Sequence, residues 1–378
     1  MLNEALLDEV AGHPQAKLLH GVGQPVGGAV DDPIEYRPLL RRCVEQLDPA
    51  WVSEHLSFNR IRGADGPEET GFLLPPRQVV SGVRVAADDV RAYGRTLGRP
   101  VAFETGVNYL QPRADEMTDG EFFAAVAGAA DCGILLDLLN LWCNESNGRD
   151  RVVDVLECLP MDRVWEVHLA GGMPLSGFWL DAHSGEIPGE VIAIAADVLP
   201  RLTSLGAIQF EILPEHVPAL GIDGVQAQLD VLQRLWDLRP PRVVEVPRRD
   251  EATPAATPQA AGTPDVVEVR AWECALTAAV RGEGAADQSH AWVRADPGTA
   301  VLRELVGDFR RGALTRTLRY TITALLAGIG RRHTHEVLDS YFAHHAPDSY
   351  PAVEADRFAG ISARDRRCSP PCPISRRS

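Results

Sequence analysis

Lysine is almost absent from this sequence of 378 residues: Lys17 is the only one, and arginine supplies the other basic side chains. Chemistry that needs a lysine nucleophile or a Schiff base therefore has almost nothing to work with. No run of 18 or more apolar residues occurs, so we expect no transmembrane helix and no membrane partner. The seven cysteines are an odd number without a CxxC pair, which predicts free thiols rather than a disulfide framework.

The N-terminal stretch MLNEALLDEVAGHP has no basic region, and Glu4, Asp8 and Glu9 make it acidic. It does not have the pattern of a signal peptide, and we expect a cytoplasmic protein. The formal net charge is −16, which disfavours nucleic acid as a partner. The charge is uneven, because residues 266–378 carry 16 arginines and only 13 acidic residues. This difference indicates two parts with different surfaces.

Short apolar runs alternate with helical patterns from residue 17 to about 240. The runs are 17–20, 51–58, 100–104, 133–139, 164–170 and 207–213, and the candidate helices are 33–47, 77–97, 118–130, 150–158, 188–204 and 222–237. Such alternation predicts a parallel sheet with crossover helices, and runs that are apolar on both faces fit strands covered by helices. The predicted fold class is α/β, with residues 1–244 forming a TIM-barrel-like (β/α) domain.

The composition changes after residue 244. Residues 245–265 are rich in Pro, Ala and Thr and lack apolar periodicity, which is typical of a linker. Residues 266–362 show helical patterns and predict a mainly α-helical C-terminal domain. Residues 363–378 are predicted to be a disordered tail.

Polar side chains of metal-ligand type recur at the ends of the six apolar runs. If the strands form a barrel, their C-terminal ends meet on one face, where barrel active sites are built. So many polar groups would be costly to bury there without a metal. The candidate ligands are His20, His55, Glu104, Asp137, Asn140, His168, Asp181, His183 and Glu211, of which Asp181 and His183 follow the fifth run.

Nine candidate ligands suit a centre of two or three divalent metals, since one metal commonly takes three or four protein ligands. Histidine and carboxylate ligands without sulfur fit iron, manganese or zinc. The stretch HGVGQPVGG, residues 20–28, has the glycines of a loose dinucleotide loop, but Pro25 and Pro33 oppose the helix that such a loop requires. The glycines instead predict a close approach of the backbone to a crowded site.

The motifs LHGVG, SEHLSF, FETGVNYL, GILLDLLN, EVHLAGG, LDAH and FEIL occur in this order between residues 18 and 213. They resemble the successive strand-end motifs of the multinuclear non-heme iron-dependent oxidases, a family that includes the methanobactin-maturing oxidase. The resemblance implies a TIM barrel with two or three iron ions (Fe2+/Fe3+) that uses O2 to modify a cysteine in a ribosomally made precursor peptide. It also implies that the nine candidate residues are iron ligands or their immediate support.

The sequence departs from the family pattern at several places. Thr105 follows Glu104 where the family often has asparagine, Leu139 replaces a common asparagine, and Gly172 replaces a common histidine. Family members also have two further barrel strands before the LHGVG strand, so the resemblance implies a barrel that is incomplete at its N-terminal side. A separate partner protein often presents the peptide in this family. Residues 266–362 loosely resemble such a partner fused to the enzyme, and the alternative is a generic helical dimerisation domain.

Alternative functions share the same ligand chemistry. One is a metal-dependent sugar isomerase or an endonuclease-like barrel, although an acidic catalytic part disfavours the endonuclease. Another is a scaffold that binds a peptide without catalysis. Outside the barrel, His333 and His335 are two residues apart and lie on different faces of a helix, so we expect no metal site there. Cys143, close to Asn140, is interpreted as a buried structural thiol.

Overall fold

The computed structural model describes residues 4–29, 37–63, 66–240, 264–283, 290–348 and 351–368. The predicted linker at 245–265 lies outside the described residues except for its last two positions, which begin a helix. The predicted tail at 363–378 is helical as far as Cys368. No helix among the described residues is long and apolar enough to cross a membrane.

Six parallel strands form the central sheet in the order in which they occur along the chain. They are β1 (Leu19–Gly21), β2 (Val52–His55), β5 (Val101–Glu104), β6 (Gly133–Asp137), β7 (Val164–Ala170) and β10 (Ala207–Glu211). This sequential order with intervening helices is that of a (β/α) barrel, and the prediction of a TIM-barrel-like α/β fold is confirmed. Among the described residues, β1 and β10 each pair on one side only, so the barrel is open between them.

Helices cover the outer face of the sheet. They are α1 (Glu4–Gly12), α2 (Arg37–Leu47), α3 (Val80–Leu97), α4 (Asp119–Ala130), α5 (Leu138–Ser146), α6 (Val152–Cys158), α7 (Gly189–Val198) and α8 (Val217–Trp236). The largest hydrophobic cluster lies between these helices and the sheet, and it includes Phe103, Phe122, Leu136 and Val167. Strands β5 and β6 are buried along their whole length, as strands covered on both faces should be. The two edge strands differ, because every residue of β1 and most of β10 keep partial exposure.

Two antiparallel hairpins were not predicted from the sequence. The first consists of β3 (Phe58–Arg62) and β4 (Pro67–Leu74), and the second of β8 (Gly172–Leu175) and β9 (Phe178–Asp181). The predicted strand at 51–58 is in fact two strands, since β2 ends at His55 and β3 starts at Phe58. Each hairpin follows the C-terminal end of a barrel strand, β2 in one case and β7 in the other, and therefore stands at the rim of the predicted site.

Helix α5 is a second difference from the sequence-based expectation, which continued the strand to residue 139. The Asp137 side chain accepts a hydrogen bond from the backbone N–H of Asn140 at 2.7 Å and so caps a helix that starts at Leu138. An aspartate at this position satisfies one of the free N–H groups of the first helical turn. The buried apolar residues Leu138, Leu139 and Leu141 therefore belong to a helix and not to a strand.

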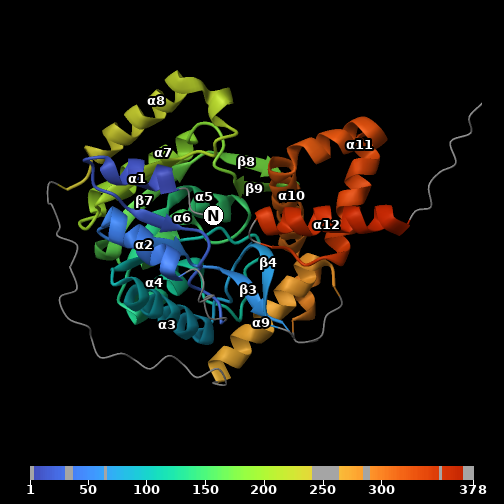
Figure 1. The fold of residues 1–378 in the computed structure, drawn as a ribbon. Helices are drawn as coiled ribbons and strands as arrows, with labels where there is room; N and C mark the ends of the chain where they lie inside the picture. Colours follow the sequence, from blue (N-terminus) through green and yellow to red (C-terminus); the bar gives the residue numbers. More distant parts are fainter. Residues whose placement is uncertain are drawn as a thin grey trace, which may run out of the picture.

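The C-terminal part consists of α9 (Pro264–Arg281), the 3-10 turn η4 (Ala291–Ala295), α10 (Pro297–Thr317), α11 (Arg319–His344) and α12 (Pro351–Cys368). In Figure 1 these helices, orange to red, lie beside β3, β4, β8 and β9. A second hydrophobic cluster joins them to both hairpins, and it contains Phe58 and Leu180 from the hairpins together with Trp272, Leu276 and Leu302. The helices thus pack on the rim at which the barrel strands end.

Candidate metal centre

Six of the nine predicted ligands lie at or near the C-terminal ends of the six barrel strands. The strand register brings neighbours together, because His55 pairs with Glu104 across β2 and β5, and Asp137 pairs with His168 across β6 and β7. Side chains at paired positions of parallel strands share one face of the sheet. Residues of ligand type that are far apart in the sequence therefore lie together in a cluster inside the barrel.

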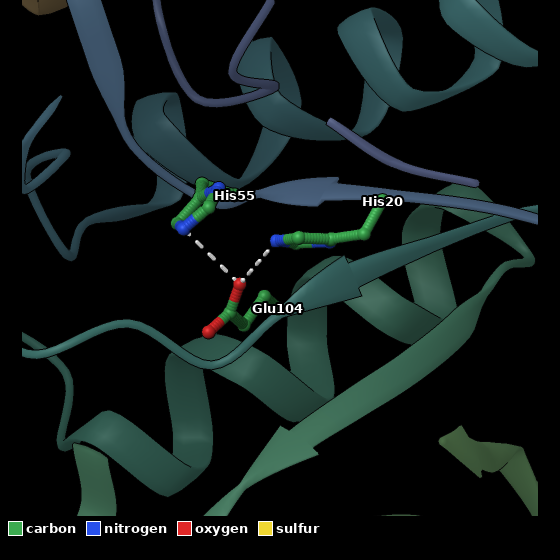
Figure 2. Close-up of side chains that lie close together, drawn as sticks. All are labelled: His20, His55 and Glu104. Carbon is green, nitrogen blue, oxygen red and sulfur yellow. Dashed lines mark ion pairs between the residues drawn. The ribbon is translucent and has the colours of Figure 1, made fainter. Parts of the chain in front are cut away.

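The first group of the centre is formed by His20, His55 and Glu104. Both imidazole Nε2 atoms lie 3.2 Å from the same carboxylate oxygen, Oε2 of Glu104. Figure 2 shows the two rings approaching this oxygen from different sides. The two rings also contact each other, with centroids 4.9 Å apart. Two nitrogen atoms and one oxygen atom therefore converge on a small volume, as the ligands of one metal ion do.

The second group contains Glu104, Asp137 and His168. One ligand atom of each lies within 4.8 Å of the others, and all three side chains are buried. Glu104 belongs to both groups, so a carboxylate is available to bridge two metal ions. Asn140 joins this group through its Nδ2, which donates to Glu104 Oε1 at 3.3 Å and to the Thr105 carbonyl at 3.2 Å.

A third set of ligand-type side chains lies beside His168. His168 Nδ1 is 3.2 Å from Glu211 Oε2, and His183 Nε2 is 3.3 Å from the same oxygen. Asp181 Oδ1 lies 3.0 Å from His183 Nε2. Asp181 ends β9, and His183 follows in the left-handed backbone region with φ 46°. The structure thus brings all nine predicted residues to one region of the barrel.

The buried polar atoms of this region test whether a metal fits. Within the part of the chain that the structure describes, six buried atoms lack a hydrogen bond of regular geometry: Glu104 Oε2, Asp137 Oδ2, Asn140 Oδ1, His168 Nδ1, Asp181 Oδ1 and His183 Nε2. Four of them face other candidate ligands in ion pairs, whereas no ion pair among the described residues reaches Asp137 Oδ2 or Asn140 Oδ1. Buried polar atoms are almost always paired, because an unpaired one costs free energy. All six are oxygen or nitrogen atoms able to ligate a metal, and they lie next to one another. The donor set therefore fits divalent metal ions.

In three of the candidate ligand histidines, His20, His55 and His168, the remaining nitrogen contacts a group that the sequence analysis did not identify. His20 Nδ1 contacts Ser53 Oγ at 3.0 Å, and His55 Nδ1 contacts the Gly21 carbonyl at 3.1 Å. These contacts direct the Nε2 atoms toward Glu104, which is how supporting partners orient metal-binding histidines. A sequence signal for Ser53 existed, because Ser53 and His55 are two apart and share one face of β2.

His168 is oriented from the other side of the centre. Its Nε2 lies 3.0 Å from Glu166 Oε1, and the second oxygen of Glu166 accepts a hydrogen bond from Trp51 Nε1 at 2.9 Å. All three side chains are buried or nearly so. Glu166 stands two residues before His168 on β7, and this spacing was the signal that sequence analysis overlooked.

The charges of the centre are coupled. Burial disfavours the charged imidazole of His55, but the Glu104 and Glu54 carboxylates outweigh burial and raise its pKa to about 10. Burial raises the pKa of Asp137 well above its usual value, and the nearby carboxylates of Asp181 and Glu104 add to the effect. Metal ligands must be deprotonated, so a metal that binds here displaces these protons.

The departures at Leu139 and Gly172 lie next to each other. A Cβ built on Gly172 would be 3.3 Å from Leu139 Cδ1 and 3.2 Å from the carbonyl of Leu180. Two positions that are commonly polar in the family are thus replaced by an apolar contact. A side chain larger than hydrogen at position 172 would have to displace this contact.

Two further predictions can be compared with the structure. Cys143 is fully buried, and burial raises the pKa of its thiol far above the ordinary value, which fits a structural cysteine. Cys43, Cys132, Cys143, Cys158 and Cys274 are all free thiols. His333 and His335 are exposed, and neither belongs to a metal-binding group among the described residues.

The fold and the site define a TIM-barrel-like protein with a carboxylate- and histidine-rich centre at the ends of its strands. Residues 3–216 match the family model of the RiPP precursor modification enzyme MbnB/TglH/ChrH. The chain belongs to this family, which confirms the resemblance found in the strand-end motifs.

Relatives named only as UPF0276 proteins support this assignment. One from Anaeromyxobacter sp. (strain Fw109-5) is 32% identical over 207 residues, which are 54% of this chain and 70% of the relative. One from Chromobacterium violaceum is 35% identical over 185 residues, which are 49% of this chain and 65% of the relative. The chain thus spans about two thirds of the length of these relatives.

Among solved structures, similarity is limited. A crystal structure of the IOLI protein with a binding zinc atom aligns with a TM-score of 0.40 and 13% identity, covering 61% of this chain and 81% of that one. A D-tagatose 3-epimerase-like protein aligns with a TM-score of 0.38 and 13% identity, covering 62% and 83%. Likeness at this level has no bearing on function.

Proposed function

We propose that the chain is an iron- and O2-dependent enzyme that oxidises a cysteine of a ribosomally made precursor peptide. The observation that carries the proposal is a group of six buried ligand atoms around Glu104, His168 and His183 that lack a hydrogen bond of regular geometry, four of which face other candidate ligands. Membership in a family of RiPP precursor modification enzymes supports a peptide as the substrate. Iron bound at this centre would supply the redox chemistry with O2 that protein side chains lack.

The side chains of this chain have three tasks in the proposal. His20, His55 and Glu104 would hold one iron ion, and Asp137, His168 and Glu211 would hold iron on the other side of Glu104. Asp181, His183 and Asn140 would complete the ligand set or support it. Ser53, Glu166 and the Gly21 carbonyl fix the imidazole orientations before any metal binds, which lowers the cost of assembling the centre.

The C-terminal helices, residues 266–362, are proposed to act as the partner-like domain that presents the peptide. Their position supports this role, because α10 contacts the β8–β9 hairpin through a hydrogen bond from Ser176 Oγ to Glu304 Oε2 at 3.1 Å. The first turn of α10 also packs on the segment after β5, where a Cβ on Gly298 would lie 2.0 Å from the Tyr109 carbonyl. Both contacts are at the rim of the metal centre.

Metal content tests the proposal first. The protein is purified anaerobically with Fe2+, and metal per chain is measured by elemental analysis for the wild type, His168→Ala and the control His333→Ala, whose side chain is exposed. We expect two or three iron ions per chain in the wild type and the control, and fewer in His168→Ala. Zinc or manganese in place of iron would favour a hydrolase or isomerase, and no metal at all would favour a binding scaffold.

The reaction itself is tested with O2 consumption and peptide mass. Iron-loaded protein is mixed with cysteine-containing peptides and with matched peptides that carry serine instead. O2 consumption and a mass change that occur only with cysteine would support the proposal. Equal O2 consumption with both sets would contradict it.

A further inference from the structure

We propose that helix α9 is a positioning element of the metal centre, in which Arg270 and Glu273 fix the loop that orients His55. The loop comprises residues 22–29, which directly follow β1 and its last residue, Gly21. The inference rests on the proposed function, because it assigns to the C-terminal helices a role in building the iron site in addition to the proposed presentation of the peptide.

The contact between α9 and the loop is made at Ala29. The Ala29 N–H donates to Glu273 Oε1 at 2.6 Å, and the Ala29 carbonyl accepts from Arg270 Nη2 at 3.2 Å. The backbone N–H and the carbonyl of Ala29 are therefore both held by α9, through two side chains that are three residues apart on that helix. Ala29 also packs against Val266 and Val269 of α9.

Glu273 is a carboxyl side chain buried between α9 and the loop, and the packing of helices alone does not explain why a polar group lies there. Its side chain is 1% exposed, and its second oxygen, Oε2, has no hydrogen-bond partner among the described residues. A buried carboxyl with one unpaired oxygen is costly. The compensating contact is the hydrogen bond to the loop, which joins residues separated by 244 positions in the sequence.

The loop needs such an anchor because of its composition. It contains Gly23, Gly27 and Gly28 and directly follows Gly21, and glycine has more backbone freedom to lose than any other residue. Close packing requires three of these glycines, Gly21, Gly27 and Gly28, whereas a Cβ on Gly23 would meet nothing within 4 Å. A Cβ on Gly28, for example, would lie 2.9 Å from Phe58 Cβ and 3.3 Å from Glu273 Oε1. The loop therefore has little stiffness of its own and takes its position from its contacts.

From Ala29 the loop runs directly to the metal ligands. Val26 N–H donates to the His55 carbonyl at 2.9 Å, and Gln24 N–H donates to Glu54 Oε2 at 3.1 Å. The Gly21 carbonyl then contacts His55 Nδ1 at 3.1 Å, which leaves Nε2 facing Glu104. A shift of the loop would move the Gly21 carbonyl and release the orientation of the His55 ring.

The experiment compares Glu273→Ala with Glu273→Gln, which keeps an oxygen that accepts from Ala29. The control is Arg303→Ala, which loses hydrogen bonds to the Ala279 and Val280 carbonyls at the end of α9 but does not touch the loop. Arg270→Met is a second, milder test, since Arg270 is only partly buried. Two quantities are measured: amide hydrogen exchange of residues 22–29 in metal-free protein, and Fe2+ affinity by anaerobic competition with a chelator.

We expect Glu273→Ala to accelerate exchange in the loop and to weaken Fe2+ binding about tenfold or more, as loss of a supporting partner of a metal ligand does. Arg270→Met should act in the same direction, whereas Glu273→Gln and Arg303→Ala should keep the wild-type values. Unchanged loop exchange in both Glu273→Ala and Arg270→Met would overturn the inference. If the wild type bound no Fe2+, the proposed function would fail, and the exchange measurement would still decide whether α9 holds the loop.

Discussion

Glu166 shows how a single side chain can set the chemistry of a metal ligand. One of its oxygens faces His168 Nε2, and the other accepts from Trp51 Nε1. Because both Glu166 oxygens act as acceptors, His168 Nε2 donates to Glu166, and Nδ1 is left to face Glu211 and the centre. A carboxylate is the only side chain of this size that offers two acceptors and no donor.

The substitution Glu166→Gln should therefore impair the metal centre although it changes only one atom. The amide group would have to point its NH2 at either the His168 or the Trp51 N–H. We expect Fe2+ affinity to fall about 10- to 100-fold, measured by chelator competition. Trp51→Phe, which removes a donor and leaves His168 its acceptor, should have a smaller effect, and an equal loss in both variants would contradict this role of Glu166.

Glu273 makes the stability of the protein depend on pH. Burial raises the pKa of this carboxyl to about 8 from its ordinary value of 4.5, against the opposing effects of the Ala29 N–H and Arg270. The folded protein then binds the proton more tightly than the unfolded chain does. The stability contributed by the protonated form is complete below about pH 4.5 and is lost as the pH rises through about 8.

The substitution Glu273→Gln removes this titration and should flatten the dependence of the free energy of unfolding on pH. In metal-free protein, the free energy of unfolding of the wild type should fall relative to that of Glu273→Gln between about pH 5 and pH 8. Denaturant titrations at several pH values measure this difference. Glu268→Gln, on the exposed face of the same helix, is the matched control and should run parallel to the wild type. A constant difference between Glu273→Gln and the wild type would argue against the raised pKa.

At the scale of elements, a buried ion pair holds together the segments that surround Glu104. Arg149 Nη2 lies 2.6 Å from Asp119 Oδ1 at the start of α4, and the same nitrogen donates to Gln78 Oε1 before α3. Its Nη1 donates to the Leu110 carbonyl in the segment that follows β5. The pair is almost fully buried, with the Arg149 and Asp119 side chains 2% and 0% exposed.

Arg149→Ala should consequently be strongly destabilising. It leaves the Asp119 carboxylate buried without a cation, and such a loss costs about 3–5 kcal/mol of unfolding free energy. Arg151→Ala is the control, because its 3.8 Å pair with Asp154 is exposed and contributes less than about 1 kcal/mol. Chemical denaturation of both variants measures the difference, and similar losses in the two would show that the buried network does not stabilise the fold.

At the scale of the whole molecule, the barrel rim and the C-terminal helices share one hydrophobic cluster. Leu276 of α9 is completely buried in it, together with Phe58 of β3 and Leu180 of β9. The barrel hairpins and the helices therefore bury their apolar surface against each other. We expect the two parts to unfold together instead of as separate domains.

Leu276→Ala tests this expectation. A cavity at a fully buried leucine costs about 2–5 kcal/mol, and this loss should appear equally in the exchange of slow amides in α9 and in β3. Leu326→Ala in α11, where the side chain is 43% exposed, should change stability by about 0.5 kcal/mol or less. Destabilisation limited to α9 would show that the barrel is stable without the helices.

The order and chemistry of the candidate ligands were determined by the sequence itself. Ligand-type residues at the ends of successive apolar runs predicted the parallel sheet, the nine candidate residues and the family. These features are local, since each depends on a strand pattern and on the polar residue that ends it. The hairpins and helix α5 were missed because short apolar runs do not distinguish strand from helix, and because a turn after His55 interrupts a continuous apolar pattern.

Only the tertiary structure decided which atoms meet. The convergence of His20 and His55 on a single oxygen of Glu104 depends on the register of three strands, and a shift of one residue would turn these side chains to the opposite face. The contact of Glu273 with Ala29 joins two positions 244 residues apart. Local patterns carry no information about such pairs, because the free energy that selects them comes from the packing of the complete chain.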